Sequence, residues 1–206
     1  MSKVLAVGDV HQKEWIFDKV DKIADQYDYV VFVGDYTDNF FAASEDRPMI
    51  IESLMSLMNK HKNIISICGN HDFCYFDDDS KGLYSGWDPI AQIIFDSKPH
   101  LVDFMKSLPQ VHEIDGITYS HAGLTDDWDE LRHPLAVDGH MWVRPQHGYV
   151  YKENQVFGHT PSKTCYEVQK SVWCIDSFSQ YRDGSYIGDC TVLEVTDGKK
   201  YTVISL

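Results

Sequence analysis

The sequence is poor in basic residues. Its 206 residues include 18 Lys and Arg against 32 Asp and Glu, which gives a formal net charge of −14. Nonspecific binding of nucleic acid depends on basic side chains that release counterions from the phosphates, so this charge argues against a long nucleic acid as the partner. It argues equally against docking on an anionic membrane surface.

The sequence also lacks a long hydrophobic run and a paired-cysteine motif. Its longest apolar runs, such as residues 30–33, are far shorter than the roughly 20 residues that span a bilayer. The N-terminus has no pattern of a secretory signal, and the five cysteines are odd in number, with no Cys-x-x-Cys. These absences predict a cytoplasmic protein with reduced thiols. The length of 206 residues predicts one domain over residues 1–206.

The first third of the chain alternates between strand and helix patterns. Short apolar runs at 3–8, 29–33 and 64–68 each end in Gly-Asp or Gly-Asn. Between them, apolar residues recur with helical spacing over 16–27 and 50–58. Such alternation favours parallel strands joined by right-handed crossovers, and ligands then bind beyond the carboxyl ends of the strands.

The remainder of the chain is predicted to form a second sheet. Strand patterns occur at 111–114, 117–120, 155–157, 171–175, 186–195 and 201–206. Residues 77–107 contain a polar loop and then one or two short helices, which we expect to form a helical cap over the site. The predicted fold is an α/β domain in which two sheets form a β-sandwich flanked by helices.

Polar clusters with metal-binding side chains occur at five places along the chain, each at a predicted strand end. They are Asp9-Val10-His11, Gly34–Asp38, Gly69–Asp72, Ser120–Gly123 and Gly158–Thr160. Asp, His and Asn are ligands suited to Mn²⁺, Fe or Zn²⁺ rather than to a thiolate site. Two such ions about 3.5–4 Å apart can clamp both the attacking and the leaving oxygen in phosphoryl transfer.

This ordered set of motifs resembles the calcineurin-like metallophosphoesterases, from about residue 3 to residue 179. Two further stretches, Leu108-Pro109 leading to Ser120–Leu124 and then Val156–Thr160, resemble the bacterial and phage branch of the phosphoprotein (Ser/Thr) phosphatases. The resemblance implies a four-layer α/β sandwich with its metal site at the carboxyl ends of the strands. It also implies a hydrolase in which a metal-bridging water attacks phosphorus directly.

The resemblance also assigns roles to residues. It implies two divalent ions, most often Mn²⁺ with Fe or Zn²⁺ as alternatives, on six ligands: Asp9, His11, Asp35, Asn70, His121 and His159. Asp35 would bridge the two ions. His71 matches a histidine that protonates the leaving alkoxide, and Asp38 matches the acid that orients it. Asp176 is expected to have a supporting role near the site.

Two positions bear on substrate binding. The phosphoprotein phosphatases usually have an arginine after the acid that corresponds to Asp38, where this chain has Asn39. Arg144 resembles a second phosphate-binding arginine of the family. We therefore expect Asn39 and Arg144 to contact the substrate. Loss of a bidentate arginine contact is more costly for a dianionic monoester than for a monoanionic diester.

These observations favour a phosphomonoesterase, most similar to a Ser/Thr protein phosphatase, that acts on a phosphoprotein or a small phosphoester. The alternative is a phosphodiesterase or a dinucleoside polyphosphate hydrolase with the same site, which Asn39 favours. A third hypothesis is a non-catalytic scaffold, like the retromer scaffold subunit of this fold. Such proteins typically lose the motif histidines, whereas His11, His71, His121 and His159 are all present here.

Overall fold

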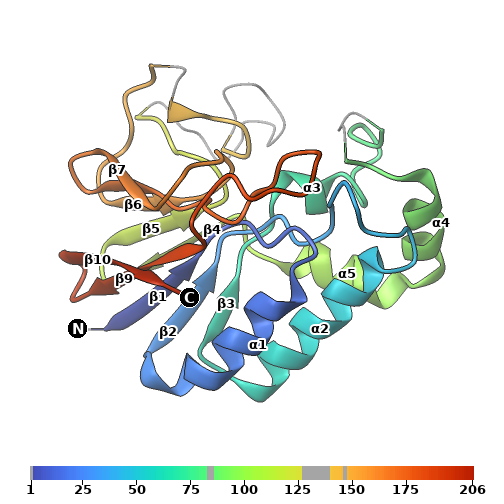
Figure 1. Ribbon diagram of the computed structural model, residues 1–206, viewed down its shortest axis with the longest axis horizontal. Helices are drawn as coiled ribbons and strands as arrows, with labels where there is room; N and C mark the ends of the chain where they lie inside the picture. The colour runs from blue at the N-terminus through green and yellow to red at the C-terminus, as the bar shows by residue number, and fades with distance from the viewer. Residues whose placement is uncertain (1, 83–85, 127–139, 146–147) are drawn as a thin grey trace.

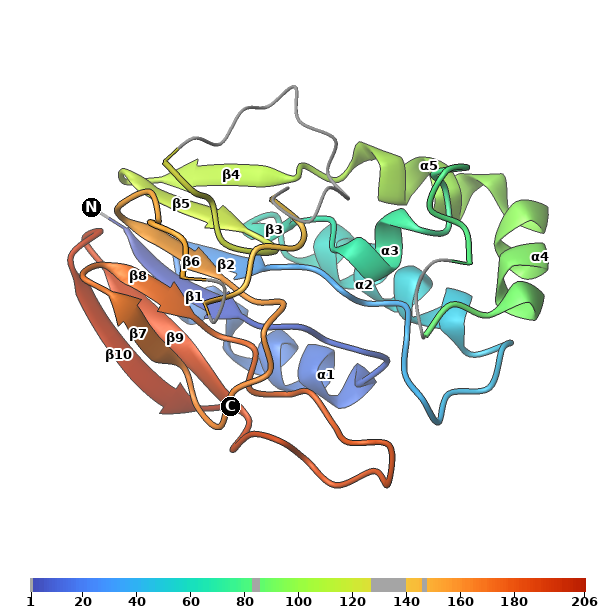
Figure 2. The same cartoon turned by 90° about the horizontal axis from the view of Figure 1, so that it is seen from above.

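The computed structural model describes residues 2–82, 86–126, 140–145 and 148–206. Two sheets of five strands are stacked on each other, and helices cover one side of the stack (Figures 1 and 2). The predicted two-sheet α/β sandwich flanked by helices is therefore confirmed. Three residues of the predicted cap range, 83–85, lie outside the described residues.

The first sheet has the strand order β10-β9-β1-β2-β3. Its strands are β1 (Lys3–Val7), β2 (Tyr29–Phe32), β3 (Ile64–Ser66), β9 (Thr191–Thr196) and β10 (Lys200–Ser205). Strands β1, β2 and β3 are parallel to one another, as the alternating patterns predicted. Strand β9 is antiparallel to both of its neighbours, β1 and β10. The carboxyl ends of the three parallel strands therefore meet at one edge.

The second sheet has the order β4-β5-β6-β8-β7. Its strands are β4 (Val111–Ile114), β5 (Ile117–Ser120), β6 (Gln155–Phe157), β7 (Tyr166–Gln169) and β8 (Val172–Cys174). Strands β5, β6 and β8 are parallel to one another. The sequence pattern missed β7, a strand of only four residues that are all at least partly exposed, and it began the strand that becomes β9 five residues too early.

Six helical segments are described, namely α1 (Glu14–Ile23), the 3₁₀ turn η1 (Ala24–Gln26), α2 (Arg47–Lys60), α3 (Asn70–Phe73), α4 (Pro89–Ser97) and α5 (Pro99–Ser107). Helices α1 and α2 lie side by side on the outer face of the first sheet (Figures 1 and 2). Helices α4 and α5 pack against α2. No helix in the described ranges is long and apolar enough to cross a membrane.

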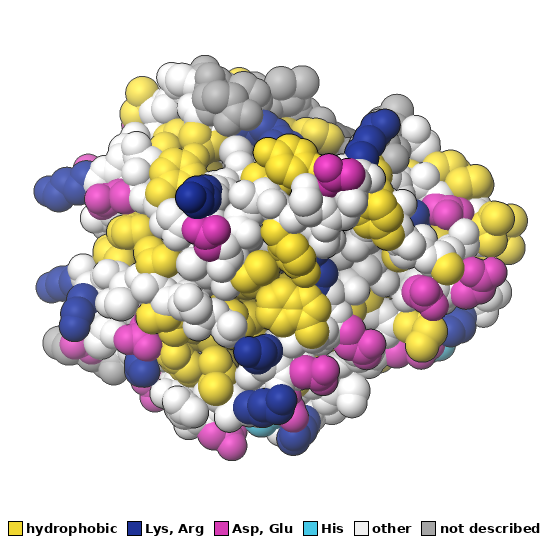
Figure 3. All heavy atoms as spheres, viewed as in Figure 1, with side chains coloured by type: hydrophobic (Ala, Val, Ile, Leu, Met, Phe, Trp, Pro, Cys, Tyr) yellow, Lys and Arg dark blue, Asp and Glu magenta, His cyan; other side chains and the backbone are white. Residues whose placement is uncertain are grey.

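The side chains of β1 alternate between two hydrophobic cores. Leu5 and Val7 pack under the helices, and Val4 and Ala6 pack between the two sheets. Because all four are buried, the first sheet is apolar on both faces, as expected for parallel strands covered on both sides. On the face drawn in Figure 3, basic side chains are interspersed with acidic and apolar ones.

Candidate metal centre and active site

The structure brings the five polar clusters together at the carboxyl ends of the strands. Asp9 follows β1, Asp35 follows β2, Asn70 follows β3, and His121 and His159 follow β5 and β6. The loops approach one another so closely that two glycines are required sterically. A Cβ on Gly158 would clash with the Asp9 carboxylate, and one on Gly69 would clash with Asp35.

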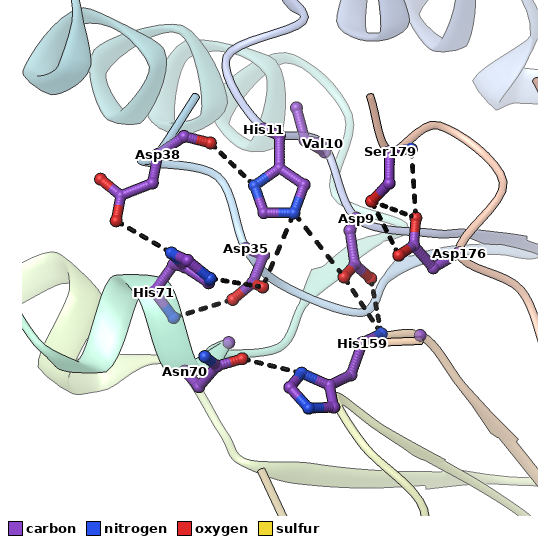
Figure 4. A network of polar contacts seen from close by, with 12 residues as sticks. Asp9, Val10, His11, Asp35, Asp38, Asn70, His71, His159, Asp176 and Ser179 are labelled. Atoms are coloured by element: carbon purple, nitrogen blue, oxygen red, sulfur yellow. Dashed lines mark hydrogen bonds and ion pairs between the residues drawn. The ribbon is translucent and has the colours of Figure 1, made fainter. Parts of the chain in front are cut away.

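One group of candidate ligands consists of Asp9, His11 and Asp35. The Nε2 atom of His11 lies 3.9 Å from Asp9 Oδ2 and 3.8 Å from Asp35 Oδ2 (Figure 4). The other ring nitrogen, Nδ1, lies 2.8 Å from the carbonyl oxygen of Asp38 and must therefore carry the proton. Burial is the main cause that lowers the pKa of His11 to about 3, so its Nε2 lone pair is free to bind a cation.

The second group consists of Asp35, His121 and His159, with the Asn70 amide beside them. His121 Nε2 lies 3.4 Å from Asp35 Oδ2, 2.6 Å from Asn70 Oδ1 and 3.1 Å from His159 Nδ1. Because His121 Nδ1 donates to the carbonyl oxygen of Val33 at 2.9 Å, its Nε2 is unprotonated. Burial lowers the pKa of both histidines.

The two groups fit divalent cations. Asp35 belongs to both, so it is placed to bridge two ions. Burial, and then the charges of Asp176 and Asp35, raise the pKa of Asp9 well above its usual value, and a bound cation would relieve that repulsion. His121 Nε2, His159 Nδ1 and Asn70 Oδ1 lie 2.6 to 3.1 Å from one another, and an imidazole nitrogen and an amide oxygen can each offer a lone pair to a cation.

His71 and Asp38 form a hydrogen-bonded pair next to these groups. His71 Nδ1 lies 2.9 Å from Asp38 Oδ2, and His71 Nε2 lies 4.0 Å from Asp35 Oδ2 (Figure 4). Burial lowers the pKa of His71, but the charge of Asp35 and the hydrogen bond to Asp38 together outweigh it and raise the pKa to about 9. The hydrogen bond to Asp38 therefore favours the protonated imidazole.

One pocket of about 170 Å³ is lined by six of these residues, namely Asp9, His11, Asp35, Asp38, His71 and His159. Arg144 lines it too, and its positive charge contributes to lowering the pKa of His159 and His121. Asn39 also lines the pocket, but its side chain binds backbone. Its Nδ2 donates to the carbonyl oxygen of His11 at 3.1 Å, and its Oδ1 accepts from the amide of Phe41 at 3.0 Å.

The pocket extends past the two groups toward the loop after β8. Asp176 and Ser179 line this end, together with Lys13. The Asp176 carboxylate is buried and accepts from the Ser179 hydroxyl at 2.9 and 2.8 Å. Figure 4 places this pair on the opposite side of His11 from Asp38. The Asp176 carboxylate thus holds the loop that forms this wall.

Asp72 is a further residue of the site, for which the sequence analysis predicts no role. Its Oδ1 accepts from the amides of Tyr36 at 2.8 Å and Thr37 at 3.1 Å, and its Oδ2 accepts from Gly69 at 3.0 Å. It therefore ties the loop that contains Asp35 to the helix that contains His71. An acid two residues after Asn70 is the only sequence signal, and it does not identify these partners.

We expect Asp72→Ala to lower the free energy of unfolding by about 3 kcal/mol, because three buried N–H groups would lose their acceptor at roughly 1 kcal/mol or more each. Denaturant titration measures this change. Asp72→Asn is the matched control, since its carbonyl oxygen can still accept and its loss should be smaller. A loss below about 1 kcal/mol for the alanine variant would show that the loops do not depend on Asp72.

The chain is similar to phosphoesterases and phosphatases both in sequence profile and in fold. The sequence profile of the calcineurin-like phosphoesterases matches residues 2–187. A cold-active protein tyrosine phosphatase has a TM-score of 0.67 and 16% identity, over 98% of this chain and 78% of that chain. A protein serine/threonine phosphatase from Saccharomyces cerevisiae, described as similar to human phosphatase PP5, has a TM-score of 0.61 and 16% identity, over 99% and 80%.

A metallophosphoesterase from Sphaerobacter thermophilus has a TM-score of 0.56 and 16% identity, over 99% of this chain and 88% of that chain. No curated protein matches the sequence. At these identities the solved structures show a shared fold, and the family profile carries the assignment.

Proposed function

The chain belongs to the calcineurin-like phosphoesterase family, and we propose that it is a two-metal phosphomonoesterase that acts as a Ser/Thr protein phosphatase. Family membership makes it a metal-dependent phosphoester hydrolase. The proposal adds the substrate class, the roles of individual residues and Mn²⁺ as the ion in a cytoplasmic enzyme. The observation that carries it is the His71–Asp38 pair, which lines the same pocket as Asp9, His11, Asp35 and His159 of the two groups of candidate ligands.

In this proposal the ligand groups divide between two ions. One ion would be held by Asp9, His11 and Asp35, and the other by Asp35 with Asn70, His121 and His159. When bound, such ions stabilise charge on the phosphate oxygens and lower the pKa of a coordinated water toward 7. The protein contributes fixed tautomers, because the outer nitrogens of His11 and His121 are held by backbone carbonyls.

His71 would supply the proton for the leaving group. A serine or threonine alkoxide is a poor leaving group, so protonation at its oxygen is worth about 10²–10⁴-fold in rate. Asp38 accepts a hydrogen bond from the Nδ1–H of His71, which leaves the Nε2–H directed toward the pocket as the acid. Arg144 would place a guanidinium beside the phosphate's non-bridging oxygens.

The second candidate function is hydrolysis of a phosphodiester or a dinucleoside polyphosphate. It is favoured by Asn39, which supplies no charge where the related phosphatases have an arginine and whose amide is engaged with backbone. A diester with one negative charge needs fewer cationic contacts than a monoester with two.

The test is a comparison of two esters. Protein stripped of metal and reloaded with Mn²⁺ is assayed on p-nitrophenyl phosphate and on bis-p-nitrophenyl phosphate. A strong preference for the monoester, followed by turnover of phosphoserine peptides, is the expected result. A preference for the diester would favour the second candidate. Metal uptake without turnover of any of these esters would contradict the proposed phosphatase.

Arg144→Ala is expected to lower kcat/KM for the monoester by about 10–100-fold, the value of a charge-assisted contact to phosphate, with a smaller loss for the diester. Arg182→Ala is the matched control, because Arg182 is an exposed arginine that lies over the Phe40 ring without lining the pocket. Equal turnover by Arg144→Ala and the control would exclude Arg144 from phosphate binding.

A further inference from the structure

Arg47 is a buried cation that binds the Asp38 carboxylate from behind. It is the first residue of α2 and is 7% exposed. Its Nη1 atom lies 2.8 Å from Asp38 Oδ1 and 3.3 Å from the Tyr75 hydroxyl, and it also donates to the carbonyl oxygen of Gly86. A guanidinium removed from water needs a paired carboxylate. Asp38 supplies the closest one, and Asp88 Oδ2 lies 3.8 Å from Nη2, whereas Nε has no hydrogen-bond partner among the described residues.

The two oxygens of Asp38 have different partners. Oδ1 accepts from Arg47 and, at 2.8 Å, from the Tyr75 hydroxyl, whereas Oδ2 faces His71 Nδ1 at 2.9 Å. A carboxylate held on one oxygen by two donors cannot rotate freely about its Cβ–Cγ bond, so the other oxygen stays directed at the imidazole. Figure 4 shows His71 between Asp38 and Asp35, with Asp38 on the outer side.

Helix stability does not account for Arg47. A positive side chain in the first turn of a helix opposes the helix dipole, which favours acids there. Arg47 is also absent from the described residues that line the catalytic pocket, so it does not bind the phosphate there as the usual family arginine would. Arg47 does bind two loop carbonyl oxygens, that of Gly86 through Nη1 and that of Asn39 through Nη2 at 3.3 Å. A test of its role must therefore separate the effect of these loop contacts from an effect on His71.

We propose that Arg47, together with Tyr75, is a positioning residue that fixes Asp38 so that His71 presents its proton to the leaving group. The inference rests on the proposed function, because it assumes that His71 protonates a leaving oxygen. No sequence motif indicates this arrangement, since Arg47 follows Asp38 by nine residues and lies on a different element.

The kinetic test compares substrates that differ in their need for an acid. Arg47→Met, which keeps the length of the side chain, is expected to lower kcat on a phosphoserine peptide by about 10–100-fold with little change in KM. Turnover of p-nitrophenyl phosphate, whose leaving group needs no proton, should fall less than about 3-fold. Tyr75→Phe removes one neutral donor and should give a smaller loss with the same substrate pattern.

Two further measurements separate positioning from loop structure. In an Asp38→Asn background, Arg47→Met should cause no additional loss, because both act through the same imidazole. In ¹⁵N-histidine-labelled protein, Arg47→Met should shift the Nδ1–H signal of His71, or make it exchange with water. The signal is assigned by its absence in His71→Asn, and this readout needs no turnover.

Equal losses on both esters, additive losses with Asp38→Asn, or an unchanged His71 signal would overturn the positioning role. Failure of the wild-type protein to hydrolyse any ester, with a shifted signal in Arg47→Met, would instead contradict the proposed function and leave the contact to His71 in place. If Arg47→Met does not fold, Tyr75→Phe decides by the same substrate pattern and the same signal.

Discussion

Replacing Asp35 by asparagine is expected to lower kcat/KM for phosphate esters by about 10³-fold or more. Asp35 belongs to both groups of candidate ligands and lies 3.8 Å from His11 and 3.4 Å from His121. The substitution removes the negative charge that two cations would share, and metal ions contribute several kcal/mol of transition-state stabilisation, where 1.4 kcal/mol is a factor of ten. Steady-state kinetics with added Mn²⁺ measure the loss.

Asp103→Asn is the control for Asp35→Asn, because it makes the same charge change on an exposed residue of α5. The control should keep its activity and its thermal stabilisation by Mn²⁺, whereas Asp35→Asn should lose most of both. A ligand that binds only the folded state raises the free energy of unfolding by about 2.7 kcal/mol when its concentration is a hundred times Kd. Near-normal turnover by Asp35→Asn would contradict a bridging role.

His71→Asn is expected to slow hydrolysis of a phosphoserine peptide by about 10²–10⁴-fold while slowing p-nitrophenyl phosphate far less. The reason is the difference between the leaving groups, because an alkoxide needs a proton and a nitrophenolate does not. The imidazole is poised for this transfer by its contact with Asp38, which contributes to raising its pKa to about 9. Rates on a series of aryl phosphates with leaving groups of different pKa would show the trend directly.

His100→Asn is the matched control for this experiment, since it replaces an exposed histidine of α5. Both variants should bind as much Mn²⁺ as the wild type, because His71 is in neither group of candidate ligands. Equal slowing of both types of ester by His71→Asn would remove the residue from the role of general acid. Loss of metal would show that it acts as a ligand.

Most of the fold could be predicted from the sequence because each helix or strand leaves a pattern of apolar residues within a short stretch of the chain. Parallel strands buried on both faces are short apolar runs, and β1, β2 and β3 each precede a Gly-Asp or Gly-Asn step. Since parallel strands have their carboxyl ends at one edge, the residues after them were expected to meet. The family assignment is confirmed by the profile over residues 2–187, and the roles of individual site residues stay predictions.

The supporting contacts could not be predicted because they join distant segments. Arg47 reaches Asp38 from a separate helix, and Asp72 accepts hydrogen bonds from a loop about 35 residues earlier in the chain. Neither contact leaves a periodic pattern in the sequence. Strand β7 was missed for a related reason, since four residues that are all at least partly exposed form no apolar run, and the strand is defined by its pairing with β8.

The most direct test of the account is the number of Mn²⁺ ions that the protein binds. Metal-free wild-type protein and Asp35→Asn would be equilibrated with Mn²⁺, and the bound ions counted by elemental analysis and by calorimetric titration. Two ions per wild-type chain, with one or none in Asp35→Asn, is the result that the two groups of ligands predict. A wild-type chain that binds one ion or none at saturation would contradict the two-metal centre.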